Sequence, residues 1–131
     1  MSYQMQTISE SQMPVVLVIE DSSFQRKILC KFITDEGYQV CEAANGKIGL
    51  ELVASRQPDL IFCDLVMPEL DGFEVLKKLQ EMKSTIPIVI LTSDIQEPVR
   101  KQCLELGALE FINKPSSPVK VQGALQKAFG S

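Results

Sequence analysis

Three short runs of mostly apolar residues constrain the fold of this chain more than any other feature of its sequence: VVLVI at 15–19, LIFCD at 60–64 and IVILT at 88–92. Nearly unbroken apolar runs of this length are typical of central strands in a parallel sheet, because helices cover both faces of such a sheet. Two further runs, YQVCEA at 38–43 and EFIN at 110–113, are also predicted to be strands.

Helical patterns separate the five predicted strands. The first helix carries apolar residues at helical spacing from Phe24 to Ile33 and stops at Gly37. Asn45-Gly46 precedes the second helix, and Asp71-Gly72 precedes the third, at about 73–82. The fourth helix carries Ile95, Val99, Cys103 and Leu106 and ends at Gly107. Ser117-Pro118 opens a fifth helix that runs through Phe129. Strands that alternate with helices imply right-handed crossovers and a parallel α/β sheet.

The length of the chain fits one domain. We assign residues 14–131 to it and residues 1–13 to a flexible polar tail. The net charge of −4 and the lack of a basic run argue against nucleic acid or anionic lipid as a partner. No apolar segment of the sequence reaches the length of a membrane span, and the N-terminal residues lack the pattern of a secretory signal.

The cysteines are scattered, without a C-x-x-C pair, in apolar or helical patterns: Cys30, Cys41, Cys63 and Cys103. Such residues behave as small apolar side chains, and we expect reduced thiols in a cytoplasmic protein. The chain contains no histidine, which excludes a histidine nucleophile, base or phosphoryl carrier within it.

Polar side chains stand where four of the predicted strands end. They are Glu20 and Asp21 after the first strand, Asp64 at the end of the third, Thr92 and Ser93 at the end of the fourth, and Lys114 after the fifth. In an open parallel sheet, functional groups gather beyond the carboxyl ends of the strands. Three carboxylates, two hydroxyls and an ammonium are therefore expected along one edge.

Carboxylates held this close repel one another, since two unit charges roughly 4 Å apart interact by about 4 kcal/mol at an effective dielectric constant of about 20. Lys114 offsets part of this repulsion, and a hard divalent cation offsets more of it. Mg²⁺, or alternatively Mn²⁺, prefers oxygen ligands and commonly takes one or two carboxylates together with phosphate oxygens. Asp64 would then be able to attack phosphorus, while Thr92 and Lys114 neutralise charge on the phosphoryl oxygens.

Four fragments, IEDS, FCDLVMPELDGFEV, ILTS and INKP, occur in this order, each at the end of a predicted strand. Together they resemble the receiver domain of two-component response regulators, including stand-alone chemotaxis regulators, from about Pro14 to Phe129. The resemblance implies a flavodoxin-like fold, with a five-stranded parallel sheet in the order 2-1-3-4-5 and five surrounding helices.

The resemblance also implies roles for the polar residues. Asp64 would accept a phosphoryl group from a phosphohistidine of a sensor histidine kinase or phosphotransfer protein. Thr92 would bind that group through its hydroxyl, and Lys114, aimed inward by a cis peptide bond to Pro115, would pair with it. The Mg²⁺ ligands that it implies are Glu20, Asp21, Asp64 and the backbone carbonyl of Val66.

The conformational switch is assigned to Thr92 and Phe111. Phe111 stands where this family has its switch aromatic, often a tyrosine in the chemotaxis members, and its lack of a hydroxyl removes a hydrogen bond to a partner. The expected output is contact with an effector protein on the face made by the fourth helix, fifth strand and fifth helix, and a phosphatase is a further candidate partner. Val66 and Asp94 flank the site, and the direction of their effect on phosphate lifetime is open.

Simpler readings exist for single residues. Glu20 and Asp21 could cap the first helix, Thr92 could be an ordinary strand-end hydroxyl, and Phe111 could be a fixed core residue.

Several other protein classes are alternatives to a signalling switch that is not an enzyme. A phosphorelay intermediate, or a receiver excised from a larger regulator or hybrid kinase, would have the same motifs. A flavodoxin-like nucleotide or flavin binder would need a glycine-rich phosphate loop where IEDSSF stands. A dehalogenase-type phosphatase would need an aspartate at Val66. A degenerate receiver is disfavoured because the five key residues are intact: Glu20, Asp21, Asp64, Thr92 and Lys114.

Overall fold

Five parallel strands form a single sheet in the order β2-β1-β3-β4-β5, as predicted, in a computed structural model that describes residues 13–94 and 96–130. The strands are β1 (Val15–Ile19), β2 (Gln39–Ala43), β3 (Leu60–Asp64), β4 (Ile88–Thr92) and β5 (Glu110–Asn113). The helices are α1 (Ser23–Asp35), α2 (Gly46–Arg56), α3 (Gly72–Glu81), α4 (Glu97–Glu105) and α5 (Pro118–Phe129). The flavodoxin-like α/β fold expected from the sequence is therefore confirmed.

The strand boundaries agree with the sequence prediction, except that β2 begins at Gln39. Tyr38, which was included in the predicted strand, lies just before β2, and its ring stacks on Phe129 at a centroid distance of 5.0 Å. Residues 1–12 of the predicted tail lie outside the described residues, as does Ile95, which was assigned to the fourth helix.

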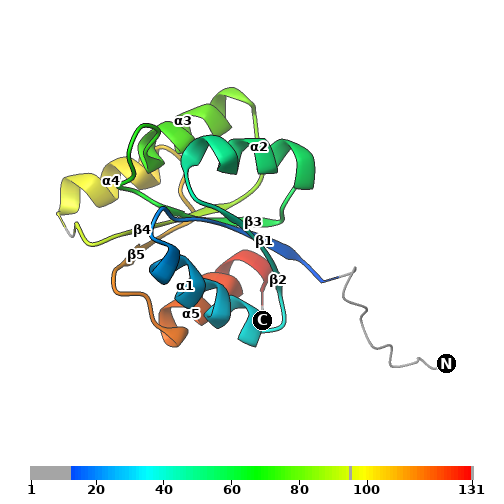
Figure 1. Ribbon diagram of the computed structural model, residues 1–131. Helices are drawn as coiled ribbons and strands as arrows, with labels where there is room; N and C mark the ends of the chain where they lie inside the picture. The colour runs from blue at the N-terminus through cyan, green and yellow to red at the C-terminus, as the bar shows by residue number, and fades with distance from the viewer. Residues whose placement is uncertain (1–12, 95, 131) are drawn as a thin grey trace.

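Two layers of helices cover the sheet, with α1 and α5 on one face and α2, α3 and α4 on the other (Figure 1). Side chains of β1 alternate between the two faces: Leu17 and Ile19 pack with α2 and α3, whereas Val16 and Val18 pack with α1 and α5. All four are fully buried. This double covering explains why the central strands are apolar at nearly every position.

Capping side chains stand at the starts of four helices. Side-chain oxygens of Ser22, Asn45, Asp71 and Ser117 accept hydrogen bonds from backbone N–H groups in the first turns of α1, α2, α3 and α5. Such caps satisfy N–H groups that have no partner within the helix. Because α1 follows Glu20 and Asp21 directly, its cap also fixes the loop at the end of β1.

The start of α3 packs against the loop that follows Asp64. The Gly72 N–H donates to the Leu65 carbonyl at 2.8 Å. A Cβ on Gly72 would lie 2.8 Å from the Leu65 Cα and 2.9 Å from the Asp64 carbonyl oxygen, so only glycine fits here without a shift of the backbone.

Among the helices of the described residues, none is long and apolar enough to cross a bilayer.

Candidate functional site

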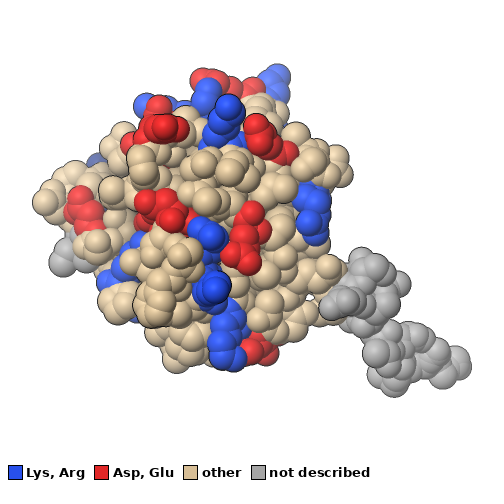
Figure 2. Space-filling model, in the orientation of Figure 1, with Lys and Arg blue, Asp and Glu red and all other residues tan. Residues whose placement is uncertain are grey.

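Three carboxylates meet at the carboxyl edge of the sheet. Glu20 and Asp21 follow β1, Asp64 is the last residue of β3, and an oxygen from each lies within 4.8 Å of the others. Asp64 and Glu20 are only 5% and 3% exposed, whereas Asp21 is exposed. Figure 2 shows acidic side chains gathered at this edge and basic side chains over α1. The structure thus brings together the three acids that the sequence placed at one edge.

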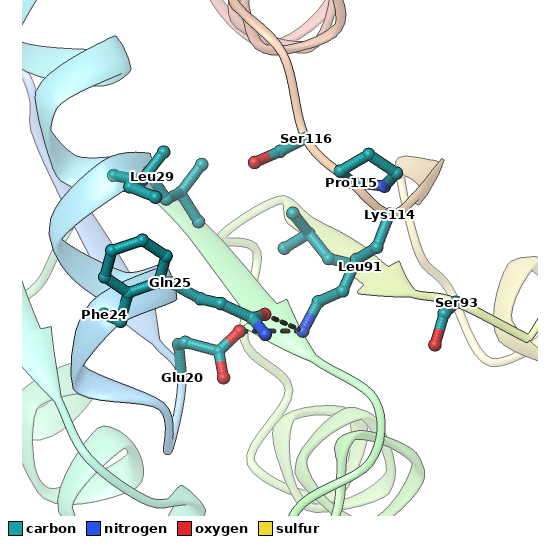
Figure 3. Close-up of a pocket in the computed structure, with 10 residues that line it drawn as sticks. Glu20, Phe24, Gln25, Leu29, Leu91, Ser93, Lys114, Pro115 and Ser116 are labelled. Atoms are coloured by element: carbon teal, nitrogen blue, oxygen red, sulfur yellow. Dashed lines mark hydrogen bonds and ion pairs between the residues drawn. The ribbon is translucent and has the colours of Figure 1, made fainter.

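Lys114 reaches this cluster from the loop between β5 and α5. Its peptide bond to Pro115 is cis, as the family resemblance implied. The ammonium lies 2.9 Å from Glu20 Oε1 and 3.1 Å from Asp64 Oδ1, and its side chain is 18% exposed. It also donates to Gln25 Oε1 at 2.7 Å, and Figure 3 shows the lysine extended toward Glu20 and Gln25.

The pKa values reflect this crowding. Burial, and then the charge of Glu20, raise the pKa of Asp64 to about 6, although the hydrogen bond and charge of Lys114 act against the rise. Burial alone would lower the pKa of Lys114, but hydrogen bonds and charges from Glu20 and Asp64 outweigh it and raise that pKa. The lysine is therefore a cation at neutral pH that only partly neutralises the two buried acids.

Thr92 ends β4, one residue after Leu91, which is paired in register with Asp64 of β3, and it is 1% exposed. Its hydroxyl oxygen accepts the Asp94 N–H at 3.1 Å, and its carbonyl accepts the Lys114 N–H at 2.8 Å. The backbone of the threonine therefore ties the end of β4 to the loop that carries the lysine.

The remaining predicted residues lie around this centre. Val66 follows Asp64 by two residues and is 69% exposed. Phe111 is half-buried in β5, paired in register with Ile90, and packs against the core on the α2–α4 face. Asp94 accepts the Gln96 N–H at 3.0 Å through Oδ1.

Two side chains of α1 belong to the site but were not predicted from the sequence. Gln25 binds the ammonium of Lys114, which lies 89 positions away. Arg26 donates from a guanidinium NH to the Glu20 carbonyl at 2.7 Å and from Nε to Glu42 Oε1 at 2.9 Å. Their only sequence signal is their place in the first turn of a helix that starts directly after two acids.

A pocket of about 390 Å³ opens beside Lys114. Polar groups of Glu20, Gln25 and Lys114 lie at one end of it, and Phe24, Ile28, Leu29, Leu91 and Pro115 provide apolar walls (Figure 3). Phe24 is 74% exposed at its edge. A polar end beside an apolar wall gives the site room for a group that approaches the acids.

The acids fit a hard divalent cation. Every donor in the cluster is a carboxylate oxygen, which is the ligand type that Mg²⁺ and Mn²⁺ prefer. Burial, and then the charge of Glu20, raise the pKa of Asp64 even with the Lys114 ammonium 3.1 Å from its Oδ1. Glu20, Asp21 and Asp64 could therefore hold such an ion.

Comparisons with known proteins agree with this fold and site. Residues 16–126 match the sequence model of the response regulator receiver domain. The chain is 33% identical over 113 residues to the chemotaxis protein CheY of Thermotoga maritima, covering 86% of this chain and 94% of that protein. A structure of CheY4 from Vibrio cholerae is similar with a TM-score of 0.83 and 28% identity, covering 89% of this chain and 99% of that one.

A longer relative shares only this part. The protein-glutamate methylesterase/protein-glutamine glutaminase of Treponema denticola is 40% identical over 105 residues, covering 77% of this chain. The chain spans only 28% of that relative's length, so the likeness concerns the receiver part alone. With the family match over most of its length, and with the sheet order and acidic edge described above, this chain belongs to the response regulator receiver domain family.

Proposed function

We propose that this protein, as one receiver domain over residues 14–131, is a cytoplasmic switch that accepts a phosphoryl group on Asp64. The observation that carries this proposal is the environment of Asp64. It is a buried carboxylate at a strand end, 3.1 Å from an ammonium, with two further acids nearby and a buried hydroxyl on the next strand. A charge this costly to bury is more consistent with chemistry than with packing.

The donor would be a phosphohistidine of a sensor histidine kinase or phosphotransfer protein, as the family implies. The chain itself contains no histidine that could play this part. A carboxylate oxygen of Asp64 attacks phosphorus, a P–O bond forms, the P–N bond breaks, and its electron pair returns to the imidazole of the donor. Lys114 and the Thr92 hydroxyl donate hydrogen bonds to the phosphoryl oxygens, where negative charge accumulates.

We assign the metal ligands to the three carboxylates and to the backbone carbonyl of Val66. When bound, Mg²⁺ would neutralise the acids and the incoming phosphoryl oxygens. The chain's contribution is to fix the ligands: the Ser22 N–H donates to Glu20 Oε2 at 3.0 Å, and Arg26 holds the Glu20 carbonyl. Asp64 is fixed by its place at the end of a central strand.

Signal output would begin at Thr92. When its hydroxyl turns to the phosphoryl group, the hydrogen bond from the Asp94 N–H is released and space opens near Phe111. Phosphorylation supplies about −1.5 to −2 charges, and charge-assisted hydrogen bonds are worth about 1.5–3 kcal/mol each. Two such bonds approach the ~5.5 kcal/mol needed to invert a 1:99 equilibrium. An effector protein would then bind the face made by α4, β5 and α5, and a phosphatase would be a further partner.

Phosphorylation by a small-molecule donor tests the proposal. The full chain is incubated with acetyl phosphate and Mg²⁺ and followed by intact mass spectrometry, with EDTA as the metal control. We expect one phosphoryl adduct per chain in the wild type, none in Asp64→Asn, and an unchanged adduct in Asp35→Asn, which removes a carboxylate on the surface of α1. An adduct that persists in Asp64→Asn would contradict the assignment.

The same samples separate a switch from an enzyme. A switch gives one stoichiometric adduct that decays, whereas a phosphatase continues to release phosphate from added phosphate esters over many turnovers. Transfer of the adduct onward to a histidine phosphotransfer protein would identify a relay intermediate.

A further inference from the structure

The ammonium of Lys114 has three protons and contacts three acceptors. Two of these are carboxylate oxygens, Glu20 Oε1 at 2.9 Å and Asp64 Oδ1 at 3.1 Å, and the third is the amide oxygen of Gln25 at 2.7 Å. A lysine ammonium only donates, so the amide must present its oxygen to it. The ammonium therefore donates hydrogen bonds to Glu20 and Gln25, as Figure 3 shows, and forms an ion pair with Asp64.

The three acceptors differ in what the phosphorylation cycle does to them. Asp64 loses its charge when one of its oxygens becomes an acyl phosphate oxygen. Glu20 is one of the acids that a divalent cation would compete for. Gln25 is neutral, is not among the three clustered acids, and keeps the same acceptor throughout. Of the three contacts, only that with Gln25 is available in every state of the site.

Gln25 is also attached to a fixed part of the backbone. Its own N–H donates to Ser22 Oγ at 3.2 Å, which is the N-cap contact of α1. The next residue, Arg26, binds the Glu20 carbonyl at 2.7 Å. The carboxamide thus extends from a capped helix end that is tied to β1, so it can hold the lysine against a rigid element.

We propose that Gln25 is a positioning residue for the phosphoryl transfer described above. It anchors the ammonium of Lys114 from the α1 side while the two carboxylate contacts are lost or weakened, and so keeps that ammonium directed at the phosphoryl oxygens. This inference rests on the proposed function of Asp64. It assigns a role to Gln25, which is not one of the three carboxylates and is neither Thr92 nor Lys114.

A double-mutant cycle in the phosphorylation rate tests the anchor. With acetyl phosphate and Mg²⁺, we expect Gln25→Leu to slow adduct formation by about three- to tenfold. This is less than the full effect of a charge-assisted hydrogen bond, because the contact is exposed to solvent and the lysine keeps its other contacts. The same change should have no effect in a Lys114→Met background. Gln122→Leu is the matched control. Gln122 lies on α5, away from the site, and the substitution removes an exposed glutamine contact to Glu36 Oε2 at 2.9 Å. Equal slowing by Gln25→Leu in both backgrounds would overturn the proposal.

A second measurement does not depend on phosphorylation. The ¹⁵Nζ signal of Lys114, assigned by its loss in Lys114→Met, is recorded in the metal-free protein. We expect faster proton exchange of this ammonium in Gln25→Leu and no change in Gln122→Leu. An unchanged signal in Gln25→Leu would overturn the anchor even if phosphorylation proceeds. If the wild type forms no adduct, the proposed function fails, and the signal still decides whether Gln25 holds the lysine.

Discussion

At the scale of single residues, the buried, ionised carboxylate of Asp64 lowers the free energy of unfolding. Its pKa of about 6 in the folded protein lies above the ordinary value of 3.8. The folded state therefore binds this proton more tightly than the unfolded chain does. The free energy of unfolding is expected to fall as pH rises from about 4 to about 6 and to remain lowered above that range.

Removal of this charge should stabilise the metal-free protein. We expect Asp64→Asn to raise the free energy of unfolding by about 1–3 kcal/mol at pH 7.5 in EDTA, and the gain to disappear near pH 3.5, where the wild-type carboxyl is protonated. Urea unfolding at the two pH values measures this. Added Mg²⁺ should stabilise the wild type more than the variant, since a ligand that binds only the folded state stabilises it. A variant no more stable than the wild type at pH 7.5 would show that the burial of Asp64 is not costly.

Some residues of the site could be predicted from the sequence and others could not. Glu20, Asp64 and Thr92 were predictable because each stands directly at the end of an apolar strand, and parallel strands bring those ends together. Gln25 and Arg26 were not, because their contacts depend on side-chain conformations in the first turn of α1. The roles of the predicted residues, as distinct from their positions, remain proposals that the phosphorylation experiment addresses.

At the scale of elements, the site depends on how closely α3 approaches the loop after β3. Gly72→Ala would place a methyl group 2.8 Å from the Leu65 Cα and 2.9 Å from the Asp64 carbonyl oxygen, both of which are backbone atoms. Because backbone cannot rotate away as a flexible side chain can, the loop or the helix must shift. We expect a loss of about 1–3 kcal/mol in the free energy of unfolding, measured by urea denaturation, and slower phosphorylation of Asp64.

Gly123 in α5 provides the matched control. A Cβ there meets nothing within 4 Å, and the residue lies in a helix interior, where alanine is favoured over glycine by roughly 0.5–1 kcal/mol. Gly123→Ala is therefore expected to stabilise the protein, with phosphorylation unchanged. If both substitutions stabilised the protein equally, the close approach of α3 to the Asp64 loop would be wrong.

Element boundaries were predictable where a local signal sets them. Asp71 and Ser117 mark the starts of α3 and α5 because each caps its helix with its own side chain. The start of β2 was one residue off, since Tyr38 is apolar for a reason unrelated to the strand: it stacks on Phe129 of α5. Such a contact between distant segments leaves no periodic signal in the sequence.

At the scale of the whole molecule, the two cores are built from the same strands. Cys63 lies in the core on the α2–α4 face, and Cys30 lies in the core on the α1–α5 face. Neighbouring residues of β1, β3 and β4 point into opposite cores, so loss of the sheet would disrupt both cores. The alternation of apolar residues does not determine the order of the strands in the sheet. The order 2-1-3-4-5 was predicted from the resemblance of the motifs to a known family.

The buried thiols report whether the molecule opens as one unit. Burial raises the pKa of Cys30 to about 12 and that of Cys63 further, with nearby acids adding to both effects, so few thiolates exist in the folded protein at pH 8. Since the thiolate is the reactive form, we expect a disulfide reagent to modify all four cysteines rapidly in urea and none rapidly without it. Peptide mapping by mass spectrometry at intermediate urea should show the modification rates of Cys30 and Cys63 rising with the same slope, because both thiols become accessible only through global unfolding. If Cys30 were modified under native conditions while Cys63 stayed protected, the α1–α5 layer would open separately, and the layer that carries Gln25 and borders Lys114 would be a mobile part of the switch.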